Sequence, residues 1–371
     1  MSTHPAVVTA SVRGALQVIQ VPTIAPCTGE VLVRVEWTAS TPLNLHQNDG
    51  GLLVQHPQVL GGDIAGTVVE VGPGVERLEV GDKVFGFTWR EQKEKAHQTL
   101  ATVPEYLLGI IPPHIPMRAA ATLPDNFVTV FHALTTDLHL PLPWPRPTTA
   151  PEHAHTPILL WGGASSVGQY ALQILAYYGY RRLLTTASPH HHELLRSLGA
   201  SAVFDYRAPD VVARILDAAA AADGDAGGDG GGGEAGVPFV LDCIGSLNGS
   251  LAPLAEIAGS GSTVAVLLPV IVRDATEGQA PLYSLDAGGA VAWKAGVEVR
   301  GVRTHFYLDN EFFKQKLQSE IMPTLLGQGI VKPNRFRVVE GSTLRERAQG
   351  AMDMLRRREA SGERFVWRVS E

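Results

Sequence analysis

Cysteine is scarce in this chain of 371 residues, which contains only Cys27 and Cys243. Two cysteines cannot form a disulfide framework, and this usage is typical of a reducing compartment. No apolar run is long enough to span a membrane, and residues 1–14 lack the apolar core of a secretory signal. We therefore expect a cytoplasmic protein with no membrane partner.

Positive charge is also in short supply. The chain has 30 lysine and arginine residues against 37 aspartate and glutamate residues, which gives a net charge of −7 and a pI of about 6.0. This balance disfavours nucleic acid or an anionic membrane as a partner. We interpret the short basic run Arg356–Arg358 as the solvated face of a C-terminal helix. With 45% hydrophobic residues, the chain is long enough for two domains with separate cores.

The stretch from Ile158 to Leu175 predicts a strand, a tight turn and a helix in succession. Small residues in such a turn let the backbone approach a pyrophosphate, whose charge then faces the N–H groups of the first helical turn. A tight turn in another class of α/β protein is an alternative on these residues alone, because Ser165 replaces the usual middle glycine. The candidate dinucleotide-binding residues of this turn are Gly163, Ala164, Ser165, Ser166, Val167 and Gly168.

The rest of the chain divides by composition. Residues 1 to about 110 contain short strands punctuated by glycine, as in a compact β-barrel. Prolines predict an extended surface connection over 135–157, and the glycine-rich residues 223–236 predict a flexible insertion. We expect further strands at 183–187, 239–245, 262–269 and 365–369, the last returning to the first domain, and helices at 311–326 and 343–358.

Three motifs carry a family resemblance. The run GGDIAGTVVEVGPGVERLEVGDKVFGF from Gly61 resembles the barrel signature of the medium-chain dehydrogenase/reductase superfamily. Leu123–Leu134 resembles the segment that leads that family into its nucleotide domain, and the turn at Gly162–Gly168 stands where the family has its cofactor turn. The resemblance covers almost the whole chain.

The resemblance implies an α/β protein of two domains. A GroES-like β-barrel catalytic domain would span 1–126, completed by 306–371, and a Rossmann domain with a doubly wound parallel sheet would span 127–305. The active site would lie in the cleft between the two domains.

Zinc ligands of the family are missing. The catalytic cysteine of zinc alcohol dehydrogenases would fall near Ser40 or Thr41, and their ligand histidine would fall at Gly62. Thiolate and imidazole are the ligands that hold Zn²⁺ tightly, so we expect no metal. The zinc-free branch of the superfamily transfers hydride to activated C=C bonds or to quinones.

The second strand lacks the carboxylate that binds the ribose of NAD about 20 residues after the glycine turn. Instead the chain has Ser188, His190 and His191, which leave room for a 2′-phosphate, and by resemblance Tyr206 would touch that phosphate. We therefore predict NADPH as the cofactor. An alternative role for the histidines is that they form the exposed start of a helix and do not bind the cofactor. By resemblance the remaining cofactor contacts would come from Thr129, Ile244, Gly245, Leu267, Leu268 and Val366.

The segment TPLNLHQNDGG and three others resemble the fungal subgroup that includes trans-acting enoyl reductases of polyketide pathways. Asn44 and His46 replace an acid and a lysine of that subgroup, and we take both as catalytic candidates. His46 would donate a proton or hold the cofactor ribose, with a surface-loop histidine as the alternative.

The predicted activity is therefore enoyl or quinone reduction. The substrate would be a small molecule or an acyl thioester, the latter carried by a polyketide synthase, and the chain would be a monomer or a homodimer. Two alternatives are a detoxifying reductase of small enals and enones, and a catalytically silent NADP-binding scaffold.

Overall fold

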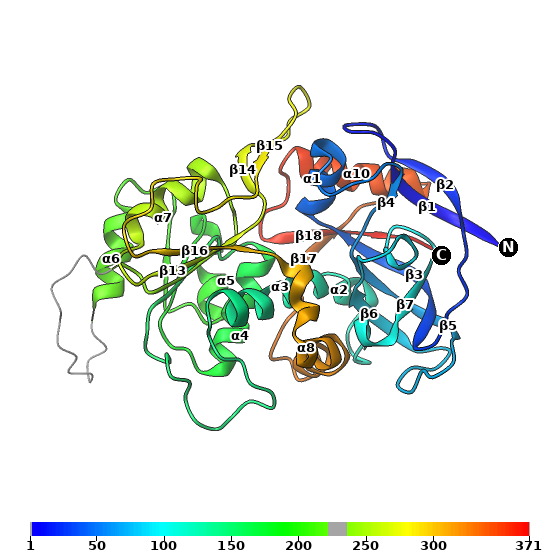
Figure 1. Ribbon diagram of the computed structural model, residues 1–371, viewed down its shortest axis with the longest axis horizontal. Helices are drawn as coiled ribbons and strands as arrows, with labels where there is room; N and C mark the ends of the chain where they lie inside the picture. The colour runs from blue at the N-terminus through cyan, green and yellow to red at the C-terminus, as the bar shows by residue number, and fades with distance from the viewer. Residues whose placement is uncertain (1, 222–235, 371) are drawn as a thin grey trace. The chain divides into compact units, whose positions relative to one another are not determined.

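The computed structural model describes residues 2–221 and 236–370. The chain divides into two compact units (Figure 1): unit 1 comprises Met1–Val128, Asp274–Leu282 and Phe306–Glu371, and unit 2 comprises Thr129–Arg273 and Tyr283–His305. The expected flexible insertion at 223–236 lies outside the described residues, apart from Gly236.

Unit 1 is built on two mainly antiparallel sheets. The smaller sheet has the order β2-β1-β4, and the larger has the order β17-β18-β3-β5-β6-β8, with β7 also paired to β3. The strands are β1 (Thr3–Thr9), β2 (Gln17–Pro22), β3 (Glu30–Ser40), β4 (Gln58–Val59), β5 (Asp63–Val71), β6 (Lys83–Phe87), β7 (Leu100–Pro104), β8 (Gly109–Ile110), β17 (Arg335–Val338) and β18 (Glu363–Arg368).

The C-terminal strand returns to unit 1 as expected, because β18 pairs antiparallel with β3. The helices of unit 1 are α1 (Pro42–Gly50), α2 (Met117–Ala120), α8 (Glu311–Lys316), α9 (Met322–Gly327) and α10 (Leu344–Arg356), with 3-10 or π turns η1 (Gln92–Glu94), η2 (Glu105–Leu107), η6 (Thr304–Asp309) and η7 (Leu317–Ile321). A capping box between Thr343 and Glu346 starts α10 and satisfies backbone donors of its first turn.

Unit 2 contains a six-stranded sheet of order β11-β10-β9-β12-β13-β16, and all its strand pairs are parallel. Its strands are β9 (Ile158–Trp161), β10 (Leu183–Thr186), β11 (Ala202–Phe204), β12 (Phe239–Asp242), β13 (Thr263–Leu267) and β16 (Glu298–Val302), with a separate pair β14 (Val270–Arg273) and β15 (Leu282–Ser284). Its helices and turns are α3 (Pro124–His132), which begins in unit 1, η3 (Ala133–Asp137), α4 (Ser166–Tyr178), η4 (Pro189–His191), α5 (His192–Ser197), α6 (Val211–Ala220), η5 (Leu247–Leu251) and α7 (Ala252–Ile257).

The strand order of unit 2 reverses between β9 and β12. From β9 the chain adds β10 and β11 on one side, and then crosses to add β12, β13 and β16 on the other. In such doubly wound sheets, ligands bind outside the carboxyl ends of the strands at this reversal. The reversal therefore marks the part of unit 2 where a ligand site belongs.

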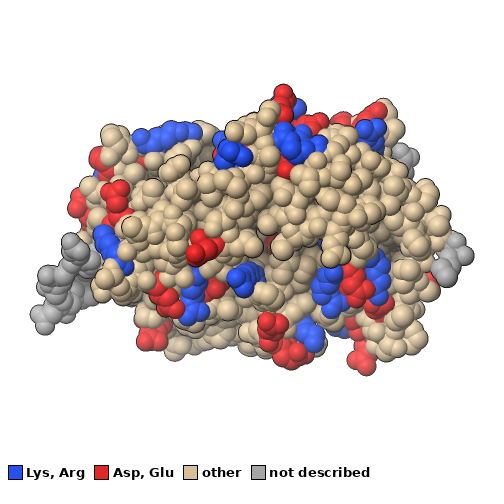
Figure 2. All heavy atoms as spheres, turned by 45° about the horizontal axis from the view of Figure 1, so that its top comes forward, with Lys and Arg blue, Asp and Glu red and all other residues tan. Residues whose placement is uncertain are grey.

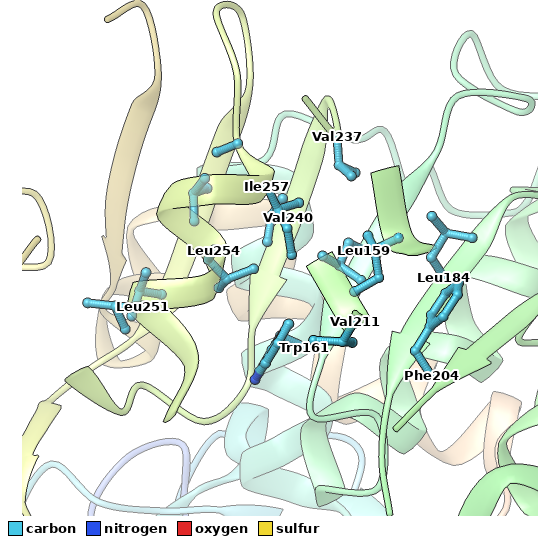
Figure 3. Close-up of a cluster of buried hydrophobic side chains, with 14 of the residues drawn as sticks. Leu159, Trp161, Leu184, Phe204, Val211, Val237, Val240, Leu251, Leu254 and Ile257 are labelled. Atoms are coloured by element: carbon cyan, nitrogen blue, oxygen red, sulfur yellow. The ribbon is translucent and has the colours of Figure 1, made fainter. Parts of the chain in front are cut away.

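A hydrophobic cluster holds the sheet of unit 2 to its helices. Trp161 of β9, Val240 of β12 and Leu254 of α7 are among its buried members, and Figure 3 shows side chains of these three elements meeting there. Burial of each large apolar side chain contributes roughly 1.5–3 kcal/mol. This packing fixes the ends of β9 and β12, from which the functional loops depart.

Candidate cofactor site

The turn after β9 is too tight for a side chain at Gly168. A Cβ there would lie 2.6 Å from both the carbonyl oxygen of Gly162 and the Cα of Gly163. Real Cβ atoms do not come that close to backbone, so glycine is required for helix α4 to pack on the turn. Gly163 is buried in the same turn, whereas Ala164, Ser165 and Ser166 are partly accessible.

Ser165 caps the N-terminus of α4. Its Oγ accepts a hydrogen bond from the N–H of Gly168 at 3.1 Å, and its own N–H donates to the carbonyl of Gly162 at 2.9 Å. The helix supplies no acceptor for the N–H groups of Ser166 and Val167, which are its first two residues. These two amides, at the positive end of the helix dipole, suit the oxygens of a phosphate.

A cation lies where β10 and β11 end. The guanidinium of Arg207 donates to the Oγ of Ser188 at 3.2 Å, and its Cζ lies 4.6 Å from the centre of the Tyr206 ring. The backbone N–H of Arg207 donates to the carboxylate of Asp205 at 3.0 Å. The structure thus brings together the predicted residues Ser188 and Tyr206 and adds Arg207, which the sequence analysis missed. The sequence could have indicated Arg207, because this basic residue directly follows the predicted phosphate contact Tyr206.

The three adjacent histidines differ in what they offer. His190 is exposed, and its ring lies 4.0 Å from that of His191, which is 3% exposed. The Nε2 of His192 lies 3.1 Å from the carbonyl oxygen of Ala187. His190 therefore presents the most accessible imidazole beside Ser188, and the other two are turned toward the protein.

The end of β12 carries a fully buried carboxylate. Asp242 accepts hydrogen bonds from the N–H groups of Ile244 at 2.9 Å and Gly245 at 3.1 Å, and from the hydroxyl of Ser250 at 2.6 Å. Burial raises the pKa of Asp242 to about 6. The predicted cofactor residues Ile244 and Gly245 are thus held by a group that the sequence analysis did not single out.

The remaining predicted cofactor residues have varied surroundings. The hydroxyl of Thr129 lies 3.0 Å from that of Thr304. Leu267 and Leu268 are half-buried. Val366 is 0% exposed in β18, which lies between β17 and β3 in the larger sheet of unit 1, so its side chain belongs to the core and presents no surface to a ligand.

The catalytic candidates Asn44 and His46 lie on α1. The Oδ1 of Asn44 accepts the N–H of Thr41 at 3.0 Å as part of a capping box, which gives Asn44 a structural role at the start of the helix. Burial lowers the pKa of His46 to about 4. The imidazole is therefore neutral near pH 7 and can donate a hydrogen bond there, but it carries no extra proton.

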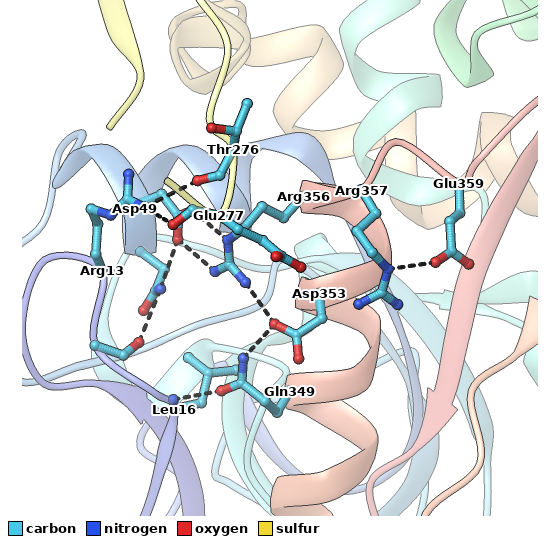
Figure 4. A network of polar contacts seen from close by, with 12 residues as sticks. Arg13, Leu16, Asp49, Thr276, Glu277, Gln349, Asp353, Arg356, Arg357 and Glu359 are labelled. Carbon is cyan, nitrogen blue, oxygen red and sulfur yellow. Dashed lines mark hydrogen bonds and ion pairs between the residues drawn. The ribbon is translucent and has the colours of Figure 1, made fainter. Parts of the chain in front are cut away.

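A polar network in unit 1 joins α1 to α10 (Figure 4). Arg356 contacts the buried carboxylate of Asp49 through Nε at 2.7 Å and Nη2 at 2.8 Å, and it also contacts Asp353. The side chain of Arg356 is only 15% exposed. The interpretation of Arg356–Arg358 as a solvated face was wrong for Arg356, because Asp49 from a distant part of the sequence neutralises it.

The family resemblance places the ligand positions of zinc relatives at Gly62 and near Ser40 or Thr41. A Cβ at Gly62 would lie 2.9 Å from Cε2 of Phe87, so an aromatic ring takes the space of a side chain there. The Oγ of Ser40 accepts the indole N–H of Trp367 at 2.9 Å. Over residues 2–221 and 236–370, no three histidine, cysteine or acidic side chains are grouped as a metal site would need.

The surface shows no large basic patch on the face drawn in Figure 2, where lysine and arginine alternate with acidic side chains. Among the helices in the described part of the chain, none combines the length and apolar character needed to cross a bilayer.

A parallel sheet with a glycine turn after β9, together with a mainly antiparallel second unit, is typical of the alcohol dehydrogenase class of fold. Residues 28–125 match the alcohol dehydrogenase GroES-like domain family. The trans-enoyl reductase himH of Aspergillus japonicus is 33% identical over 280 residues, which cover 71% of this chain and 75% of that protein.

Two further comparisons extend over nearly the whole chain. The enoyl reductase component lovC of the lovastatin nonaketide synthase of Aspergillus terreus is 28% identical over 358 residues, covering 93% of this chain and 92% of that protein. The crystal structure of an alcohol dehydrogenase superfamily protein from Novosphingobium aromaticivorans covers 100% of both chains with a TM-score of 0.71 and 24% identity. The last comparison shows a shared fold.

The chain therefore belongs to the medium-chain dehydrogenase/reductase superfamily, in its enoyl reductase branch. This confirms the family resemblance and the α/β fold class predicted from the sequence, with a GroES-like and a Rossmann-type part. The protein is an oxidoreductase, and its fold and family indicate a nicotinamide cofactor.

Proposed function

We propose that the chain is an NADPH-dependent, zinc-independent enoyl reductase that acts in trans on acyl thioesters carried by a polyketide synthase. The observation that carries the proposal is the cation where β10 and β11 end: Arg207 is hydrogen-bonded to Ser188 and lies against Tyr206. Sequence similarity to two enoyl reductases supports the choice of reaction.

The residues of unit 2 fit a dinucleotide. The tight turn closed by Gly168 brings backbone close to a pyrophosphate, and the N–H groups of Ser166 and Val167 would hold its oxygens. Gln169 fixes the turn by donating from its side-chain amide to the carbonyl of Ala164 at 2.8 Å. When bound, the nicotinamide supplies a hydride to the β-carbon of an activated C=C bond.

The choice of NADPH over NADH follows from charge. A 2′-phosphate at the ends of β10 and β11 would receive charge-assisted hydrogen bonds from Arg207, with the hydroxyl of Ser188 beside it. Residues Ala187 and Ser188, which follow β10, provide no carboxylate to accept the ribose hydroxyls of NADH. His190 would add a further donor.

Zinc independence is proposed from the space around Gly62. An imidazole at this position would have to displace the ring of Phe87, and Ser40 already accepts a hydrogen bond from Trp367. The hydroxyl of Ser40 and the missing side chain of Gly62 stand where the resemblance places the thiolate and imidazole that Zn²⁺ prefers. The enolate that forms after hydride transfer would be stabilised by hydrogen bonds, for which the neutral imidazole of His46 is a candidate donor.

A turnover assay on metal-analysed protein tests the proposal. We expect NADPH oxidation with an enoyl thioester such as crotonyl-pantetheine, much slower turnover with NADH, and less than one transition-metal ion per ten chains. Faster turnover with quinones than with enoyl thioesters would instead assign a quinone reductase, and faster turnover with small enals would assign a detoxifying reductase. NADPH binding without turnover on any of these substrates would indicate a silent scaffold.

A further inference from the structure

Asp242 lies at the reversal of the strand order in unit 2. It is the last residue of β12 and is paired with Trp161, the last residue of β9. Its side chain is 0% exposed. A buried carboxylate costs free energy unless it is well hydrogen-bonded, so its presence at the ligand-binding edge of the sheet requires an explanation.

The hydrogen bonds of Asp242 are all made within its own loop. One oxygen accepts the N–H groups of Ile244 and Gly245, and the other accepts the hydroxyl of Ser250. The Oγ of Ser250 in turn accepts the N–H of Ser246 at 2.9 Å. The carboxylate and the hydroxyl together fix the loop from its first residue to its first helical turn.

This loop contacts two other parts of unit 2. A Cβ at Gly245 would lie 2.5 Å from the carbonyl oxygen of Leu267, and the carbonyl of Gly245 accepts the N–H of Ile271 at 2.6 Å. Ile244 is 42% exposed, yet its Cδ1 lies 2.6 Å from where a Cβ of Gly162 would be. The loop therefore holds an exposed apolar side chain directly beside the glycine turn.

We propose that Asp242 and Ser250 are positioning residues that hold Ile244 and Gly245 in the conformation that receives the nicotinamide-ribose half of NADPH. This inference rests on the proposed function. The two residues act through the loop, because Asp242 is fully enclosed and its oxygens are occupied. The adenosine half depends on different residues, Arg207 and Ser188, so the two halves of the cofactor can be tested separately.

Calorimetric titration of two ligands into the variant S250A tests this division. The hydrogen bond from Ser250 to Asp242 restrains the loop within the protein, and a hydrogen bond to a charged group corresponds to roughly a tenfold or larger change in an equilibrium constant. We expect about tenfold weaker NADPH binding by S250A, with adenosine 2′,5′-bisphosphate bound within about twofold of wild type. We also expect kcat for enoyl reduction to fall more than the KM for NADPH rises, and S250T to recover part of the loss.

The matched control is N248A, since Asn248 is exposed on the same turn η5 and should leave both affinities unchanged. If S250A lowers the melting temperature below the assay temperature, D242N gives the same comparison with a nearly isosteric side chain. The positioning role alone would be overturned if a folded S250A or D242N variant bound NADPH with wild-type affinity. It would also be overturned if the affinity for adenosine 2′,5′-bisphosphate fell as much as the affinity for NADPH. Failure of the wild-type protein to bind NADPH would overturn the proposed function as well.

Discussion

Asp63 in unit 1 and Asp242 in unit 2 are both completely buried carboxylates, and they are satisfied in different ways. In unit 1, Asp63 pairs with the guanidinium of Arg364 at 2.7 Å, and its other oxygen accepts the N–H of Asp125. In unit 2, Asp242 receives two amides and one hydroxyl from residues at most eight positions away. Burial raises the pKa of both carboxyls, and Arg364 opposes this effect only for Asp63.

The difference separates a group that holds a unit together from a group that shapes a loop. Asp63, Asp125 and Arg364 come from three distant parts of the sequence, so their contacts close unit 1 on itself. The bonds of Asp242 close only its own loop, next to the cofactor turn. We therefore expect that substitution of buried polar groups in unit 1 lowers stability. Substitution of those at the carboxyl ends of the strands in unit 2 should instead weaken ligand binding.

The largest expected effect comes from R364A. Removal of one partner leaves Asp63 as an uncompensated buried charge, which costs roughly 3–5 kcal/mol. Urea denaturation should show this loss, whereas R337A on the neighbouring strand β17 should cost less than about 1 kcal/mol, because Arg337 is 45% exposed in its ion pairs. If R364A costs more free energy of NADPH binding than free energy of unfolding, buried polar groups of unit 1 do not act mainly on stability.

Next in size is G168A. The added Cβ would overlap backbone atoms of the cofactor turn at 2.6 Å, and overpacking of this kind costs up to about 3 kcal/mol. We expect a lower melting temperature together with a loss of NADPH binding by calorimetry. The control G278A should change neither, because a Cβ at Gly278 meets no atom within 4 Å. Unchanged NADPH binding by G168A would count against this turn as the pyrophosphate site.

R207A should lower affinity without loss of stability. A charge-assisted hydrogen bond to phosphate contributes roughly 2 kcal/mol, which corresponds to about 30-fold weaker NADPH binding, while NADH binding stays the same. R196A is the control, since Arg196 is an exposed arginine on the nearby helix α5. Equal losses for NADPH and NADH would show that Arg207 does not recognise the 2′-phosphate.

The smallest expected effect is a pH dependence in unit 1. His97 is 1% exposed with both ring nitrogens unpaired among the described residues, and burial lowers its pKa from 6.5 to about 3. The unfolded chain therefore binds a proton that the folded chain does not, so stability falls as pH drops from about 6.5 toward 3, by at most about 1.4 kcal/mol per pH unit.

The variant H97L removes the imidazole that takes up a proton in the unfolded chain. Between pH 7.5 and 5.5, the free energy of unfolding of H97L should rise by about 1.4 kcal/mol relative to that of wild type, as measured by urea denaturation at both pH values. H114Q is the control, because His114 is exposed. Parallel stability curves for H97L and wild type would show that the buried imidazole is not the source of the pH dependence.

Much of the framework could be predicted from the sequence, because it depends on local patterns. Apolar runs indicated β9, β12 and β13, and small residues indicated the turn at Gly168, where packing permits nothing larger. The predicted residues Ser188 and Tyr206 lie together at the ends of β10 and β11, joined by Arg207. Their roles toward a cofactor stay predictions.

The rest depends on contacts that no local pattern encodes. Arg356 looked like a surface residue until the fold placed Asp49 beside it, although the two are distant in sequence. Val366 was predicted to contact the cofactor by resemblance, and only the fold shows that its side chain is fully buried in β18, between β17 and β3. The three hydrogen bonds of Asp242 require the geometry of the loop that follows β12.

The most direct test of the account is a calorimetric titration of wild-type protein with NADPH and with NADH, on a sample whose metal content has been measured. We predict that NADPH binds at least about tenfold more tightly than NADH to protein that contains no stoichiometric transition metal. Equal affinities for the two dinucleotides, or one tightly bound zinc ion per chain, would contradict it.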